Sequence, residues 1–168
     1  MVYDNIILIG FMGSGKTAVG KILARYLHKS FVDVDSVIEK EQGASINELF
    51  ENKGEKYFRS LEQTCINTLT QKKGQIIATG GGLPIYSTIP PKSLIIYLDA
   101  DFDNILARLP AKEHAKRPLL QDEEKARSLY TERINTYKAL ATFTVDANQT
   151  IQTFIHVIVD FVLDKRVL

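Results

Sequence analysis

The segment Gly10-Phe11-Met12-Gly13-Ser14-Gly15-Lys16-Thr17 has the spacing G-x-x-x-x-G-K-T, which is typical of loops that bind nucleotide phosphates. Its glycines allow backbone conformations that a side chain would forbid, so several N–H groups can point into one concave anion site. Lys16 is then placed to reach the β- and γ-phosphates, and the Thr17 hydroxyl to bind Mg²⁺. The residues predicted to contact the nucleotide are Gly13, Ser14, Gly15, Lys16, Thr17 and Ala18.

The segments on both sides of this loop have the pattern that such a site requires. Residues 4–9 end in a continuous apolar run typical of a buried strand, and residues 17–27 carry apolar side chains at helical spacing. The positive N-terminal end of that helix would face the phosphates. A chance glycine-rich turn would not need a strand before it and a helix after it, so we favour the phosphate site.

Composition narrows the class of protein. The chain has 168 residues, a formal net charge of +1 and one cysteine, Cys65, so we expect one domain without a strong field for nucleic acid. A lone cysteine forms no internal disulfide and fits a reducing compartment. The chain opens with no secretory pattern and has no apolar run near the roughly 20 residues of a membrane span. We expect a cytoplasmic monomer that binds neither membranes nor nucleic acid, and we interpret the three scattered histidines as structural.

Strand-like and helical segments alternate along the rest of the chain. Five strands separated by helices predict a doubly wound parallel α/β sheet with right-handed crossovers. A basic, proline-bounded stretch at about residues 110–121 is predicted to be a short lid. The further strands are expected at 31–35, 75–79, 93–98 and 143–146, and the further helices at 37–41, 45–53, 55–72, 101–109, 122–139 and from 150 onward.

Two carboxylates, Asp33 and Asp35, lie at positions i and i+2 of the second predicted strand. Ligands gather at the carboxyl ends of parallel strands, where two acids would suit a metal ion and a substrate hydroxyl. The alternative is structural: Asp35 would cap a helix and Asp33 would be solvated. Taken alone, the pair supports the two interpretations about equally.

Three consecutive glycines, Gly80–Gly82, follow the third predicted strand. Their position favours close approach of a ligand to the backbone over a merely flexible loop. Arg59 lies near the start of the helix that begins at Glu55, where sequence alone favours a surface position. Cys65 falls on the apolar stripe of that helix and is interpreted as a core residue, together with Phe58, Leu61 and Leu69.

Together these segments resemble the shikimate kinase family over nearly the whole chain. The resemblance implies a P-loop fold related to nucleoside monophosphate kinases, with one domain over residues 1–168 and the strand order 2-3-1-4-5. It also implies substrate-binding helices at about 34–60, the lid at about 110–121, and transfer of the γ-phosphate of ATP to the 3-hydroxyl of shikimate with Mg²⁺ as cofactor. The motifs that carry the resemblance are Gly10–Thr17, Asp33-Val34-Asp35, Gly54–Arg59, Gly80–Gly82, Arg117-Pro118-Leu119-Leu120, and Glu132-Arg133 followed by Tyr137.

The resemblance implies a role for each of these positions. Thr17 and Asp33 match the Mg²⁺ site, and the catalytic residues would be Lys16, Asp35 and Arg117. Arg108 and Arg117 match arginines that contact ATP. The shikimate contacts would come from Asp35, from the carboxylate-binding pair Arg59 and Arg133, from Gly81 and Gly82, and from the apolar wall of Met12 and Phe58. Residues 147–150 lack an arginine that some members use near the adenine.

Three other kinds of protein share part of this pattern. A gluconate kinase of the same fold would also bind an anionic polyol, although the combination of Asp-x-Asp, three glycines and Arg-Pro-Leu-Leu favours shikimate. A GTP-binding switch would need an Asn-Lys-x-Asp motif; the nearest match, Asn52-Lys53-Gly54-Glu55, ends in Glu and precedes the third strand. A nucleic-acid-dependent ATPase is disfavoured because the sequence contains no basic, aromatic-rich stretch.

Overall fold

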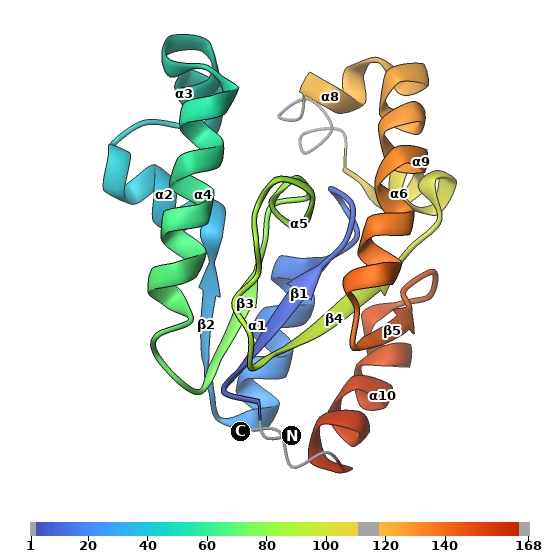
Figure 1. Ribbon diagram of the computed structural model, residues 1–168. Coiled ribbons are helices and arrows are strands. Elements are labelled where there is room, and N and C mark those ends of the chain that lie inside the picture. Colours follow the sequence, from blue (N-terminus) through green and yellow to red (C-terminus); the bar gives the residue numbers. More distant parts are fainter. Residues whose placement is uncertain (1–2, 111–117, 165–168) are drawn as a thin grey trace.

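The computed structural model of the protein describes residues 3–110 and 118–164. Within these residues the strands form one parallel sheet in the order β2-β3-β1-β4-β5. This confirms the predicted doubly wound fold and strand order (Figure 1). The strands are β1 (Asn5–Ile9), β2 (Ser30–Asp33), β3 (Gln75–Ala78), β4 (Ser93–Asp99) and β5 (Phe143–Asp146).

Helices flank the sheet and extend beyond the carboxyl ends of its strands. Figure 1 shows α2, α3 and α4 on one side of these strand ends and α6, α8 and α9 on the other. Contacts join α1 to α10, and α5 to both α4 and α9. The helices are α1 (Lys16–Leu27), α2 (Val34–Gln42), α3 (Ile46–Lys53), α4 (Glu55–Leu69), α5 (Leu83–Tyr86), α6 (Phe102–Arg108), α8 (Pro118–Gln121), α9 (Glu123–Leu140) and α10 (Ile151–Asp164).

The central strand β1 explains why its sequence reads as a continuous apolar run. It lies between β3 and β4, and all five of its residues are buried. A parallel strand covered on both faces carries apolar side chains in both directions.

The last helix, α10, is amphipathic as predicted and buries Phe154, Ile155, Ile158 and Val162, while Ile151 is only partly buried. None of the described helices is both long and apolar enough to cross a membrane.

The second strand is shorter than predicted, and this changes the setting of the two acids. β2 ends at Asp33, and α2 begins at Val34. The Asp33 carboxylate accepts a hydrogen bond from the Ser36 backbone N–H at 3.3 Å and so caps α2. The prediction of a strand through Asp35 was therefore wrong. The structural alternative was also wrong in detail, because the capping residue is Asp33 and not Asp35.

Other boundaries differ less. The predicted capping box is confirmed at the start of α3, where Ser45 and Glu48 bond to each other's backbone N–H. α4 ends at Leu69, about three residues earlier than predicted. The short helix α5 after the three glycines was not predicted. Of the predicted lid, residues 111–117 lie outside the described residues, and Pro118 begins the short helix α8.

Candidate functional site

The loop between β1 and α1 has the geometry of an anion site. Gly13 and Gly15 have φ values of 80° and 98°, which side chains other than glycine rarely adopt. A Cβ atom on Gly13 would also lie 2.9 Å from Cγ2 of Ile105. Lys16 as a residue is 8 % exposed, and its ammonium group donates to the carbonyls of Gly10 and Phe11 at 2.8 and 2.9 Å. The backbone of the loop therefore binds the ammonium group of Lys16 at the N-terminal end of α1.

Thr17 and Asp33 lie together although they are 16 positions apart in the chain. The Thr17 hydroxyl donates to Oδ2 of Asp33 at 2.8 Å, so two oxygen ligands stand beside the first turn of α1. Mg²⁺ is commonly held by one or two protein oxygens, with water and substrate phosphates completing its octahedron. The pair fits that pattern. The described residues include no cluster of three or more His, Cys, Asp or Glu that would hold a metal by themselves.

Asp35 lies in the first turn of α2 and faces Gly80, the first of the three glycines. A Cβ atom on Gly80 would lie 3.0 Å from Oδ1 of Asp35. That oxygen is buried and has no hydrogen-bond partner. Burial raises the pKa of Asp35 to about 6, with the neighbouring carboxylates of Asp33 and Glu62 adding to the rise and Lys16 opposing it. A carboxylate with this pKa is suited to orienting or deprotonating a hydroxyl near neutral pH.

Arg59 projects from α4 toward the same glycines and is not the surface arginine that sequence alone favoured. Its side chain is 17 % exposed, and its guanidinium carbon lies 4.3 Å from the centre of the Tyr86 ring. Nη1 donates to the carboxylate of Glu62 at 2.6 Å, and Nε and Nη2 both donate to Glu55. A Cβ atom on Gly82 would lie 2.5 Å from Nη1, so only glycine leaves room for this guanidinium.

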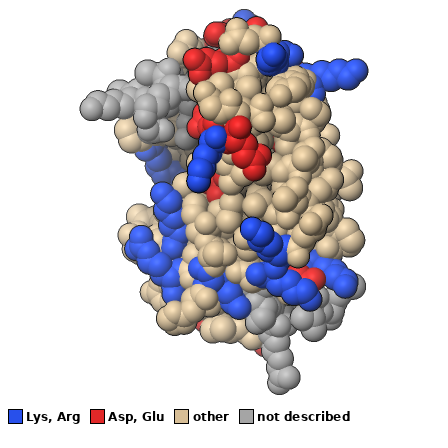
Figure 2. Space-filling view, turned by 90° about the vertical axis from the view of Figure 1, so that its left-hand side faces the viewer, with Lys and Arg blue, Asp and Glu red and all other residues tan. Residues whose placement is uncertain are grey.

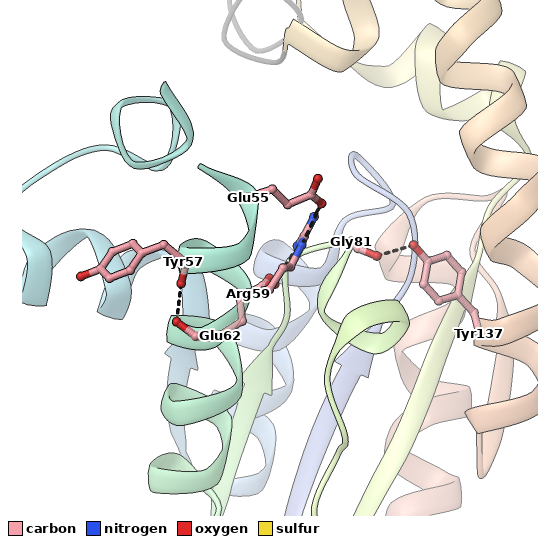
Figure 3. A network of polar contacts seen from close by, with 7 residues as sticks. Glu55, Tyr57, Arg59, Glu62, Gly81 and Tyr137 are labelled. Atoms are coloured by element: carbon pink, nitrogen blue, oxygen red, sulfur yellow. Dashed lines mark hydrogen bonds and ion pairs between the residues drawn. The ribbon is translucent and has the colours of Figure 1, made fainter. Parts of the chain in front are cut away.

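Gly81 joins the phosphate-binding loop to α9. A Cβ atom on Gly81 would lie 3.3 Å from the backbone nitrogen of Met12. The carbonyl of Gly81 accepts a 2.6 Å hydrogen bond from the Tyr137 hydroxyl, as Figure 3 shows. Burial raises the pKa of Tyr137 to about 12, so the hydroxyl keeps the proton that it donates.

The three glycines thus lie against three separate parts of the candidate site. Gly80 lies against Asp35, Gly81 against the phosphate-binding loop, and Gly82 against Arg59.

Arg133 lies on α9 one turn before Tyr137, and it is 6 % exposed with a buried Nε that has no hydrogen-bond partner. A buried guanidinium nitrogen without an acceptor is costly, and a ligand carboxylate would supply the missing acceptor.

The remaining predicted site residues have different surroundings. Phe58 is buried and packs beside Phe50 with ring centres 4.8 Å apart, whereas Met12 is partly exposed. Ala18 is exposed in the first turn of α1. Arg108 donates from Nη1 to the carbonyl of Ala147 at 2.6 Å, so it ties α6 to the loop after β5. Arg117 lies outside the described residues.

Sequence reasoning missed two glutamates that hold Arg59. Glu62 is only 1 % exposed, and burial raises its pKa while Arg59 opposes the rise. A signal was present, because Glu62 falls on the buried face of α4 between Phe58 and Cys65. An acid on an apolar stripe requires a partner, and Arg59 is three residues away. Glu55, four residues before Arg59, carried the same spacing signal.

Comparisons with known proteins agree with this geometry. Residues 12–163 match the family model described as shikimate kinase. The chain is 41 % identical to a shikimate kinase of Helicobacter hepaticus, over 98 % of both chains. The solved shikimate kinase of Acinetobacter baumannii in complex with shikimate is 34 % identical, with a TM-score of 0.87 over 99 % of this chain and 96 % of that one. The structure from Aquifex aeolicus is 32 % identical, with a TM-score of 0.79 over 96 % and 98 % of the two chains.

Proposed function

Because this chain belongs to the shikimate kinase family, we propose that it transfers the γ-phosphate of ATP to the 3-hydroxyl of shikimate. One observation carries the proposal beyond the family likeness. The loop of Gly80–Gly82 packs against the phosphate-binding loop, Asp35 and Arg59 at once. The loop that would bind the phosphate donor, the group that would orient a hydroxyl and the group that would bind a carboxylate thus lie around one short segment.

The acceptor is bound by charge and by backbone contacts. Arg59 and Arg133 bind the shikimate carboxylate, since a guanidinium can form two parallel hydrogen bonds with it. Gly81 and Gly82 contact the ring, and Met12 and Phe58 form its apolar wall. Asp35 accepts a hydrogen bond from the hydroxyl that attacks. With a pKa of about 6, it is largely ionised above that pH and can accept this proton.

The donor is bound by the loop and by the residues that follow it. Backbone groups of Gly13–Ala18 and the ammonium group of Lys16 bind the phosphates. Thr17 and Asp33 hold Mg²⁺, which when bound neutralises charge on the phosphates. Arg108 lies near the nucleotide, and Arg117 in the lid reaches its phosphates. Most of the acceleration comes from positioning and charge neutralisation, because phosphoryl transfer has a loose transition state.

We propose that residues 1–168 form one such domain, with the substrate-binding helices at about 34–60 and the lid at about 110–121, acting as a cytoplasmic monomer. A single cysteine supports a reducing compartment. Figure 2 shows acidic side chains gathered in the upper part of one face and most of the basic side chains in its lower part, with uncharged areas between them. The small formal net charge of +1 gives little support to a nucleic-acid partner.

Calorimetric titration tests the carboxylate-binding pair. Arg59→Ala and Arg133→Ala should each weaken shikimate binding by roughly 10- to 100-fold, because each removes charged hydrogen bonds, while ATP binding changes less than about twofold. Arg25→Ala, on the exposed last turn of α1, is the matched control and should change neither. An equal loss of shikimate and ATP affinity would contradict the assignment.

The lid arginine is tested by kinetics. Arg117→Ala should lower kcat by roughly tenfold or more with a small change in KM for shikimate, because its contact with the phosphates matters most in the transition state. An unchanged kcat would remove Arg117 from the catalytic residues.

A further inference from the structure

The guanidinium group of Arg59 is fixed in position by contacts on several sides. It lies 4.3 Å from the ring centre of Tyr86, 5.3 Å from that of Phe58 and 5.6 Å from that of Phe50. Nη1 is bound to Glu62, and both Nη1 and Nη2 lie close to Gly82, where a Cβ atom would be 2.5 and 2.8 Å away from them. Because Nη1 is already bound to Glu62, the edge formed by Nε and Nη2 is the one that can form two hydrogen bonds with a further acceptor.

Glu55 already binds that edge. Its Oε1 accepts from Nε at 3.2 Å and from Nη2 at 3.0 Å. This is the edge through which a guanidinium can form two parallel hydrogen bonds with a carboxylate. Figure 3 shows Glu55 and Arg59 together on α4, facing the loop that carries Gly81.

The two glutamates that hold Arg59 differ in their surroundings. Glu62 is 1 % exposed and lies beside Gly80, where a Cβ atom would be 3.3 Å from its Oε1. Glu55 is in the first turn of α4 with 55 % of its side chain exposed. An exposed ion pair is worth little and is readily broken, whereas breaking a buried one is costly. Glu62 is therefore the lasting partner of Arg59, and Glu55 is the replaceable one.

We propose that Glu55 competes with the carboxylate of the substrate for Arg59, so that substrate binding displaces Glu55 from the Nε–Nη2 edge. This inference rests on the proposed function of Arg59 and adds a residue that sets substrate affinity. Before substrate binds, Glu55 neutralises the charge of Arg59 and keeps the Nε–Nη2 edge of the guanidinium directed outward. This exchange lowers the affinity for substrate. Breaking the Arg59–Glu55 pair offsets part of the free energy that is gained when Arg59 pairs with the carboxylate of the substrate.

The test compares shikimate binding and steady-state kinetics for the wild-type protein and Glu55→Gln. Loss of an exposed pair should lower the Kd and the KM for shikimate by roughly two- to fivefold, with kcat and the KM for ATP unchanged. Glu55→Asp retains the charge and its favourable place at the helix N-terminus but is too short to keep the contact. It should also lower the Kd. Glu51→Gln, which removes an exposed charge from α3, should leave the Kd unchanged.

A gain in affinity is a result that loss of a merely structural residue would not produce. An unchanged or higher Kd for Glu55→Gln overturns the competition, as does an equal gain for Glu51→Gln, which would indicate a general charge effect. If the wild-type protein itself neither binds nor phosphorylates shikimate, the proposed function fails, and the role of Glu55 falls with it. The wild-type measurement therefore separates the two failures.

Discussion

Replacement of Asp35 by asparagine should stabilise the protein and abolish its phosphoryl transfer. Asp35 has a buried oxygen without a hydrogen-bond partner and a pKa raised by burial to about 6. Because its ordinary pKa is 3.8 and each pKa unit is worth about 1.36 kcal/mol, its ionised form destabilises the folded protein by about 3 kcal/mol at neutral pH. Asparagine has nearly the same shape and cannot ionise.

The sign of the effect follows from the protons bound. The folded state holds the Asp35 proton more tightly than the unfolded state does, so it binds more protons between pH 3.8 and about 6. The stability of the wild-type protein should therefore fall as pH rises through this window and change little above it, as far as Asp35 is concerned. Asp35→Asn should raise the free energy of unfolding by about 1–3 kcal/mol at pH 7.5, and not by more, since burying an amide also costs free energy. This gain over the wild-type protein should fall to about 1 kcal/mol or less at pH 4.5.

Urea denaturation followed by circular dichroism measures the free energy of unfolding at pH 7.5 and at pH 4.5, with EDTA present and substrates absent. Asp160→Asn, an exposed acid on α10, is the matched control and should show no such gain. A loss of stability in Asp35→Asn at pH 7.5, or an equal gain at both pH values, would refute the reasoning. A variant that is more stable yet inactive would place Asp35 among residues whose function costs stability.

Three further substitutions probe the glycines and their neighbours. Gly82→Ala should raise the KM for shikimate by roughly tenfold or more, because a Cβ atom 2.5 Å from Nη1 displaces Arg59; unchanged kinetics would contradict the close approach. Tyr137→Phe should cost about 1–2 kcal/mol in a denaturant titration, because it removes the donor to the carbonyl of Gly81; an unchanged midpoint would contradict this. Gly20→Ala should destabilise by about 1–3 kcal/mol, because its Cβ atom would overlap the Phe31 ring, and a wild-type melting temperature would show that the ring moves freely.

Much of the fold could be predicted because its signals are local. The apolar run of β1, the capping box at Ser45 and the glycines at positions 43 and 54 each specify a boundary through nearby residues. The end of β2 was harder. Alternation through Val34 suggested a strand, yet the Asp33 side chain bonds to the Ser36 backbone N–H and starts a helix there.

The site depends on contacts between distant parts of the chain, and these were harder to predict. The neighbours of Arg59 include Tyr86 and Gly82, which lie more than twenty residues away and meet it only after the sheet has formed. The bond from Tyr137 to Gly81 spans 56 residues. Spacing could have indicated the Arg59–Glu62 pair. It could not indicate that Glu62 is buried or that Tyr86 lies beside the guanidinium.

The central claim is tested most directly by a coupled assay of ADP release from Mg-ATP, with shikimate, with gluconate and with neither. Strong stimulation by shikimate and none by gluconate is the result we predict from the arrangement of Asp35, Arg59 and Arg133 around the phosphate-binding loop. Release of ADP that does not depend on shikimate, by a protein that binds ATP, would contradict the assigned acceptor and leave only the nucleotide site in place.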